Sequence, residues 1–105
     1  MADAAKVLEL SKLLHERARL AIMSTLVARE EGVEFNELLR DLGLTKGNLA
    51  VHVRKLEEAG YVEVDKRFVG RIPRTTYTLT PRGRREFGDY LDLLEGIIAT
   101  AREEA

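Results

Sequence analysis

The stretch Asn36–Arg74 reads NELLRDLGLTKGNLAVHVRKLEEAGYVEVDKRFVGRIPR and contains the start and stop signals of two short helices. Asn36 is a favourable N-cap for the first helix, and Gly43 is placed to end it in the left-handed conformation that glycine tolerates. Thr45 then caps a second helix, which Gly60 stops. Two short helices joined by so tight a turn predict a helix-turn-helix.

The second helix has two contrasting faces, and we assign the whole helix-turn-helix to residues 36–60. Leu49, Val53 and Leu56 recur at i, i+4 and i+7, which directs them towards the core. The first turn and the opposite face hold mostly polar or small side chains, as a surface that meets a partner would. These residues are Lys46, Gly47, Asn48, Val51, Arg54 and Lys55.

Residues 61–79 predict a β-hairpin, the wing of a winged helix. Its first half alternates with period two, which puts Val62, Val64 and Phe68 on the apolar side of a strand. Gly70–Pro73 has turn chemistry, and a second alternating run follows it. The tip of this wing gathers four cations: Lys66, Arg67, Arg71 and Arg74.

Helical patterns precede this unit. Residues 4–14 carry leucine and valine at the spacing of an amphipathic helix. A second helix follows and ends near Gly32, with Arg19 and Arg29 expected outside its apolar stripe. Residues 33–35 are too short for an independent strand but could add to the hairpin.

A long helix is predicted over residues 81–104, with Thr80 as its N-cap and Pro81 in its first turn. Its apolar stripe is wider than one domain needs, which favours pairing with a second copy through this helix and residues 4–14. The stripe consists of Phe87, Tyr90, Leu91, Leu93, Leu94, Ile97, Ile98 and Ala101.

The fold class that these patterns predict is mainly α (α+β), a winged helix-turn-helix with N- and C-terminal dimerisation helices. The chain of 105 residues suits a single domain over residues 1–105, and its content of 45% apolar and 33% charged residues is that of a folded, soluble protein. No apolar run approaches the roughly 18 residues of a membrane span. The N-terminus has no signal-peptide pattern, so we expect a cytoplasmic protein with no membrane partner.

Charge is distributed unevenly along the chain, although the net charge is only −1. Residues 45–85 hold ten Lys and Arg against four Asp and Glu, a net charge of +6, while the remainder holds seven against fourteen, a net of −7. A basic segment on an acidic body indicates one positive face suited to nucleic acid. The alternative is ordinary solvated charge.

The segment LTKGNLAVHVRKLEEAGYVEVDKRFVGRIPRTTYTLTPRGRREF resembles the small winged-helix transcriptional regulators related to the MarR and ArsR groups. The resemblance covers roughly residues 13–95. It implies a dimeric repressor or activator that binds double-stranded DNA and whose terminal helices pair. ArsR-type metal sensors use cysteines, and this chain has none, so we expect no thiolate metal site and no cofactor. Larger MarR proteins bind small ligands beside a longer dimerisation region. The sequence does not reveal whether a small-molecule effector acts on this chain.

The second helix supplies most of the candidate DNA contacts. In helix-turn-helix docking its first turn, Thr45–Asn48, meets base edges, where Asn48 can pair with adenine and Lys46 can reach guanine or phosphate. Gly47 would permit close backbone approach, although a first turn also tolerates glycine without any function. Val51 could touch a thymine methyl or pack under the wing.

Three further basic or ionisable positions complete the helix. His52 matches a histidine of ArsR-like sequences, and packing against the hairpin is favoured for it over base contact. Arg54 and Lys55 are candidates for phosphate contacts or solvated charge.

On the wing, Arg67, Arg71 and Arg74 should reach the minor groove or its phosphates, although a charged hairpin tip can simply protect an edge strand.

Two other functional classes compete with DNA binding. An enzyme is not expected, because the chain has two distant histidines and no recognisable catalytic or nucleotide-binding motif. A winged helix can also serve as a protein–protein interaction module, since fold alone does not decide function. The positive charge of the helix and wing favours DNA binding over this alternative. Together with the resemblance, it leads us to expect a sequence-specific regulator that acts as a homodimer on a pseudo-palindromic site, most simply as a repressor.

Overall fold

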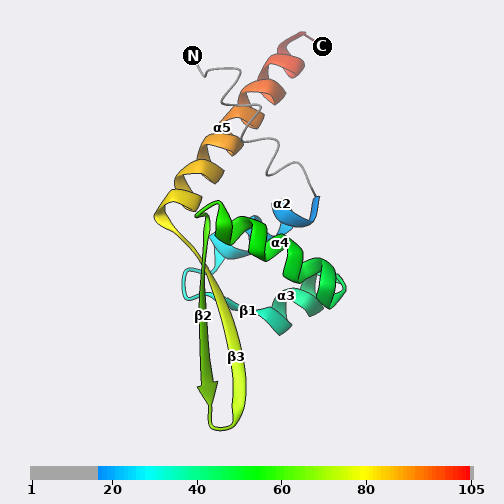
Figure 1. Ribbon diagram of the computed structural model, residues 1–105. Helices are drawn as coiled ribbons and strands as arrows, with labels where there is room; N and C mark the ends of the chain where they lie inside the picture. The colour runs from blue at the N-terminus through cyan, green and yellow to red at the C-terminus, as the bar shows by residue number, and fades with distance from the viewer. Residues whose placement is uncertain (1–16, 105) are drawn as a thin grey trace.

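The computed structural model describes residues 17–104 and shows a three-stranded antiparallel sheet with helices around it (Figure 1). The predicted helix over residues 4–14 lies outside the described residues. The sheet order is β1–β3–β2. In chain order the elements are α2 (Arg17–Ala28), β1 (Val33–Glu34), α3 (Phe35–Leu42), α4 (Lys46–Glu58), β2 (Val62–Val69), β3 (Ile72–Leu79) and α5 (Pro81–Glu104).

The turn between α3 and α4 follows its sequence signals. Gly43 has φ of 65° and donates its N–H to the Leu39 carbonyl at 3.1 Å, which ends α3. The Thr45 hydroxyl then accepts from the Asn48 N–H at 3.2 Å, which caps α4. The helix-turn-helix prediction is therefore confirmed in its turn and in its second helix.

The start of α3 differs from the prediction. The helix begins at Phe35 and its N-cap is Glu34, so Asn36 is an exposed residue of the first turn. The Glu34 N–H donates to the Glu37 side chain at 3.4 Å, half of a capping box. Glu34 still pairs with Thr76 of β3, so the chain passes from the sheet directly into α3 at this residue. This tertiary constraint places the N-cap at Glu34, two residues before the predicted Asn36.

The wing is a regular antiparallel hairpin that β1 extends on the β3 side, as the sequence allowed. Val33 lies opposite Tyr77, and Val64 lies opposite Tyr77 on the other side of β3. At the tip, Gly70 has φ of 66° while Arg71 does not have a positive φ, the pattern of a type II′ turn. The right-handed twist of the two strands is compatible with this turn.

The core lies where α2, α3 and α4 meet the near end of the sheet. Its fully buried members are Ile22, Met23, Leu26, Val33, Leu38, Leu49 and Leu56. Phe87 at the start of α5 also joins this core. Phe68 shares a face of β2 with Val62 and Val64, as predicted, yet it is exposed because the outer half of the wing extends past every helix that could cover it.

Arg19 also differs from the prediction, since we expected it outside the apolar stripe of α2. Its side chain is only 7% exposed, and its Nε has no hydrogen-bond partner among the described residues. The residue lies three positions before Ile22 and four before Met23, on the inward side of the helix. A long aliphatic stem lets an arginine occupy such a position beside apolar neighbours.

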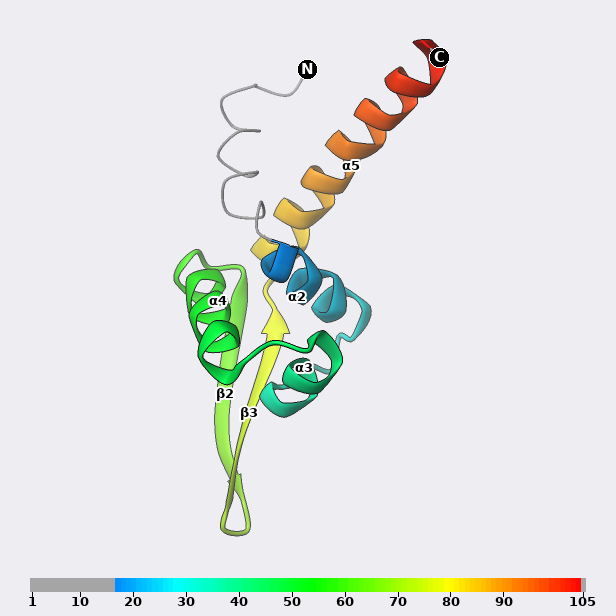
Figure 2. The same ribbon diagram turned by 90° about the vertical axis from the view of Figure 1, so that its right-hand side faces the viewer.

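The wing and α5 project from opposite ends of the body, which makes the molecule elongated, 58 Å along its longest axis (Figures 1 and 2). In both views the N-terminal end of α4 lies on the side of the body from which the wing projects. The N-terminal end of α4 and the wing can therefore contact the same partner, while α5 projects from the opposite end and can contact a different one.

The junction of α5 with the rest of the protein requires a glycine. A Cβ atom at Gly83 would come within 2.2 Å of the Tyr61 carbonyl oxygen. The backbone N–H of Gly83 also donates to the Thr80 hydroxyl at 2.9 Å, the predicted N-cap bond. The first turn of α5 is therefore pressed directly against the start of β2.

Replacing Gly83 by alanine should lower the free energy of unfolding by about 3 kcal/mol, because the backbone of Tyr61 must move to admit the methyl group. Gly88→Ala is the matched control on the same helix, since nothing lies within 4 Å of its Cβ position. It should instead stabilise the protein by roughly 0.5–1 kcal/mol through helix propensity. Urea denaturation followed by circular dichroism measures both, and equal effects of the two changes would contradict the close approach.

Candidate nucleic-acid interface

The outward face of α4 is an open surface formed by the predicted residues. Thr45, Lys46, Gly47 and Asn48 are all exposed at its first turn. Further along, the side opposite the buried stripe leaves Val51, Arg54 and Lys55 exposed, whereas His52 is half-buried. His52 differs because it follows buried Leu49 by three positions and so lies beside the inward face.

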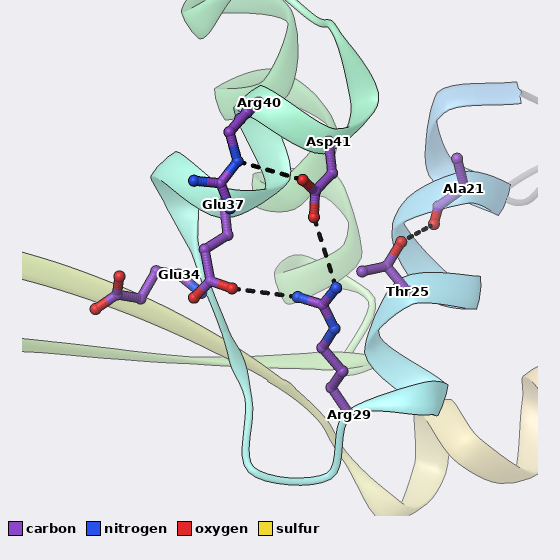
Figure 3. Close-up of polar contacts among 7 residues, drawn as sticks. All are labelled: Ala21, Thr25, Arg29, Glu34, Glu37, Arg40 and Asp41. Carbon is purple, nitrogen blue, oxygen red and sulfur yellow. Dashed lines mark hydrogen bonds and ion pairs between the residues drawn. The ribbon is translucent and has the colours of Figure 1, made fainter.

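An ion-pair cluster joins α3 to the residue that follows α2 (Figure 3). Arg29, just after α2, reaches Glu37 at 3.2 Å and Asp41 at 3.6 Å, both on α3. Asp41 also lies 3.4 Å from the guanidinium of its neighbour Arg40. Since each partner is partly exposed, such pairs contribute modestly to stability.

The three predicted wing arginines are exposed but are not equivalent. Arg67 and Arg74 lie directly opposite each other on neighbouring strands, so their two positive charges repel each other. Each is neutralised by a carboxylate: Arg67 pairs with Asp65, and Arg74 pairs with Glu34 at 2.9 Å. No ion pair is found for Arg71 at the turn among the residues that the structure describes.

Glu34 and Asp65 are therefore functional candidates that sequence reasoning missed. Both lie opposite Thr76, one from β1 and one from β2, so the two acids flank the same residue of β3. The spacing of Asp65 and Arg67, two positions apart on one strand, was a usable signal for that pair. Glu34 and Arg74 are forty positions apart, and only the pairing of β1 with β3 brings them together.

The connection between α4 and the wing is a compact polar junction. The Thr80 hydroxyl donates to the Gly60 carbonyl at 2.6 Å, and the Arg82 guanidinium lies over the Tyr61 ring, 5.8 Å from its centroid. Burial raises the pKa of the Tyr61 hydroxyl, Glu86 raises it further, and Arg82 opposes the shift. Burial, followed by Glu57, likewise raises the pKa of Tyr77. Both phenols stay neutral at ordinary pH.

Two surface hollows adjoin these elements. One of about 330 Å³ lies at the root of the wing, between the start of α3 and residues 72–75. The other is a wide, shallow hollow of about 660 Å³ along α5, lined by residues such as Leu93, Gly96 and Ile97. Within residues 17–104, no three acidic or histidine side chains converge as metal ligands. No helix of that range has the length and apolarity needed to cross a membrane.

An exposed, capped second helix of a helix-turn-helix beside a basic hairpin defines a winged helix domain. A family model described as winged helix DNA-binding domain matches residues 18–98. The chain belongs to this family of winged helix DNA-binding domains.

Relatives support the assignment. The chain is 38% identical over 80 residues to an uncharacterized protein of Methanocaldococcus jannaschii, MJ0432, covering 76% of this chain and 86% of the relative. A transcriptional regulator homologue from Pyrococcus horikoshii OT3 has a similar structure, with a TM-score of 0.83, 33% identity and coverage of 92% and 94% of the two chains. A protein from Enterococcus faecalis V583 that is assigned to the MarR family shares the fold, with a TM-score of 0.82, 24% identity and coverage of 99% and 93%.

These findings confirm the predicted winged helix-turn-helix fold and the resemblance to winged-helix DNA-binding proteins. The family is one of DNA-binding domains, and the Pyrococcus horikoshii neighbour is described as a transcriptional regulator homologue. The individual contact residues on α4 and the wing stay predictions.

The carboxylate of Glu34 should weaken DNA binding, because it neutralises Arg74 and adds negative charge near the wing. We expect Glu34→Gln to increase affinity for any duplex by about two- to fivefold, the equivalent of one surface ion pair, and to steepen the dependence on salt. Fluorescence anisotropy with labelled duplexes measures both quantities.

Glu63→Gln is the matched control for this change. It removes the same charge from an exposed position of β2 for which no ion pair is found among the described residues. If both variants gain affinity equally, general charge is responsible and the pairing of Glu34 with Arg74 is not.

Proposed function

We propose that this protein is a sequence-specific transcriptional regulator, most simply a repressor, that binds double-stranded DNA in the cytoplasm as a homodimer. The observation that carries the proposal is the joint exposure of the first turn of α4 and the cationic wing on the same side of the body. Base edges and phosphates of one duplex could be contacted by these two elements together. The family, one of DNA-binding domains, supports the same partner.

In this proposal α4 enters the major groove. Asn48 would read adenine, and Lys46 would reach guanine or a phosphate. Gly47, with nothing within 4 Å of its Cβ position, leaves room for the DNA backbone to approach. Arg54 and Lys55, on the exposed side of the same helix, would bind phosphates, whereas half-buried His52 would mainly support the helix from the side.

The homodimer would form through α5. Beyond Tyr90 the helix leaves the core, and the exposed side chains of Leu91, Ile97 and Ile98 have no cover from the rest of the described chain. The shallow hollow beside Ile97 is mostly apolar and suits a second helix. Two copies would present their α4 helices about 34 Å apart, one turn of DNA, which requires a pseudo-palindromic site.

The test is anisotropy with labelled duplexes from the region upstream of the protein's own gene, compared with scrambled duplexes at two salt concentrations. A specific regulator binds the native fragment more tightly, and this preference survives the higher salt better than binding to scrambled DNA does. Equal, weak binding to both would leave only a basic surface and overturn the proposal.

Asn48→Ala should relax discrimination at one base pair by about 1–3 kcal/mol, because the bidentate contact to adenine is lost. Arg71→Ala is the contrasting variant: it should weaken binding to all sequences and lower the salt slope by about one unit. Competition against duplexes with single base changes distinguishes the two effects. A uniform loss for Asn48→Ala would remove this residue from the specificity-determining set.

Ile97→Glu should convert the dimer to a monomer, because a buried carboxylate without a partner is costly at an apolar interface. Affinity for a palindromic duplex should fall by at least tenfold in parallel. Ala99→Glu adds the same charge on nearly the opposite side of α5, where the residue is exposed, and should leave the dimer intact. Light scattering after size-exclusion chromatography gives the mass, and a wild-type monomer at micromolar concentration would contradict dimerisation through α5.

A further inference from the structure

The tip of the wing is strongly apolar as well as basic. Phe68 is 73% exposed, Ile72 is 62% exposed and Val69 is 50% exposed. Single exposed apolar residues are ordinary on protein surfaces, but three large ones within five positions of a projecting hairpin form a patch. The other large apolar side chains found exposed in the described chain lie on α4 and α5, the two surfaces already given a partner.

Strand register distributes this patch over both faces of the hairpin. Phe68 lies opposite Pro73, and Val69 lies opposite Ile72. Since neighbouring pairs on antiparallel strands point to opposite faces, one face of the tip carries a phenyl ring beside a proline and the other carries two branched aliphatic side chains. The tip is therefore a narrow wedge that is apolar on both sides.

The charges around the wedge identify its partner. Residues 66–74 contain four cations and no acid. The turn between the strands, Gly70–Arg71, is tight, and Arg71 at its apex has no acidic partner among the described residues. An apolar wedge ringed by cations on the side of the molecule that carries the first turn of α4 is complementary to a polyanion with an apolar interior, and stacked base pairs between phosphate backbones have that composition.

We propose that the wing tip inserts its apolar side chains, led by Phe68, against a base step in the minor groove and partly unstacks it, which bends the duplex. This inference rests on the proposed function and adds how the wing binds. Unstacking costs roughly a few kcal/mol per base step, and apolar burial together with the additional phosphate contacts of bent DNA offsets that cost. Val69 and Ile72 would line the other wall of the groove, while Arg67, Arg71 and Arg74 bind the flanking phosphates.

A sequence preference follows without any hydrogen bond to a base. Pyrimidine–purine steps such as TA and CA/TG unstack most easily, so sites that carry one of these steps under each wing should be bound most tightly. Each of these steps contains a thymine on at least one strand, and unstacked thymines react readily with permanganate.

The experiment is permanganate footprinting of the upstream duplex at saturating protein, beside a nuclease footprint of the same complex. We expect reactive thymines on both flanks of the protected region with the wild-type chain. Phe68→Ser should return them to the reactivity of free DNA and keep the central protection, because α4 still occupies the major groove. Phe68→Leu, which keeps an apolar side chain, should retain at least half of the reactivity.

Arg71→Gln is the matched control at the same tip. It should lower the salt slope yet keep the reactive thymines once saturation is restored. Protection without reactive thymines, or reactivity that survives Phe68→Ser, would overturn the wedge alone. The absence of any protected region would overturn the proposed function and the wedge together.

Two other partners for the tip are tested in parallel. Wild-type binding to phosphatidylglycerol vesicles that Phe68→Ser abolishes, with DNA reactivity unaffected by the same change, would assign the tip to a membrane surface and overturn the wedge. Self-association of the protein that Phe68→Ser abolishes, with the permanganate reactivity of the DNA unchanged, would assign the tip to a second protein chain and would also overturn the wedge.

Discussion

The hydroxyl of Thr80 holds together the elements that give this protein its surfaces. It donates to the Gly60 carbonyl at 2.6 Å and accepts from the Gly83 N–H at 2.9 Å, while the Thr80 N–H donates to the Tyr61 carbonyl at 3.0 Å. The end of α4, the start of β2, the end of β3 and the start of α5 meet at this one residue. The orientation of α4 and of the wing relative to α5 depends on these three bonds and on the close approach that Gly83 permits.

This junction has a consequence for a dimer. A helix that starts at Thr80 and is fixed at Gly83 cannot turn without moving the carbonyl of Tyr61, and Tyr61 follows directly on the loop that ends α4. Pairing through the far part of α5 would therefore set the distance between two α4 helices rigidly. A rigid spacing suits recognition of sites with one fixed separation, and it leaves adjustment to the outer part of the wing, which no helix of the described chain covers.

Local signals in the sequence were enough for most of the fold, because caps and turns act over a few residues. Thr45, Gly43, Gly70 and Thr80 each behave as their positions predict. The misassigned positions, Asn36 and Arg19, are those where tertiary structure intervenes: the pairing of β1 moves a cap, and the core encloses an arginine stem. The exposure of Phe68 depends likewise on how far the strand extends beyond its cover. In the candidate site, exposure of the first turn of α4 followed from periodicity, whereas the carboxylate partner of Arg74 depended on a contact across forty residues.

The charges of the wing now divide into two groups with different roles. Arg67 and Arg74 are compensated by Asp65 and Glu34, so contact with phosphates must replace an existing ion pair, and the net gain from each is small. Arg71 has no such competitor in the described chain and stands at the apex, where a phosphate contact costs no ion pair. Lys66 likewise has no ion pair among the described residues, and a wing with two uncompensated cations would bind DNA weakly by charge alone. The apolar tip supplies a second source of affinity that salt does not screen, and it varies with the flexibility of the base step rather than with the number of phosphates.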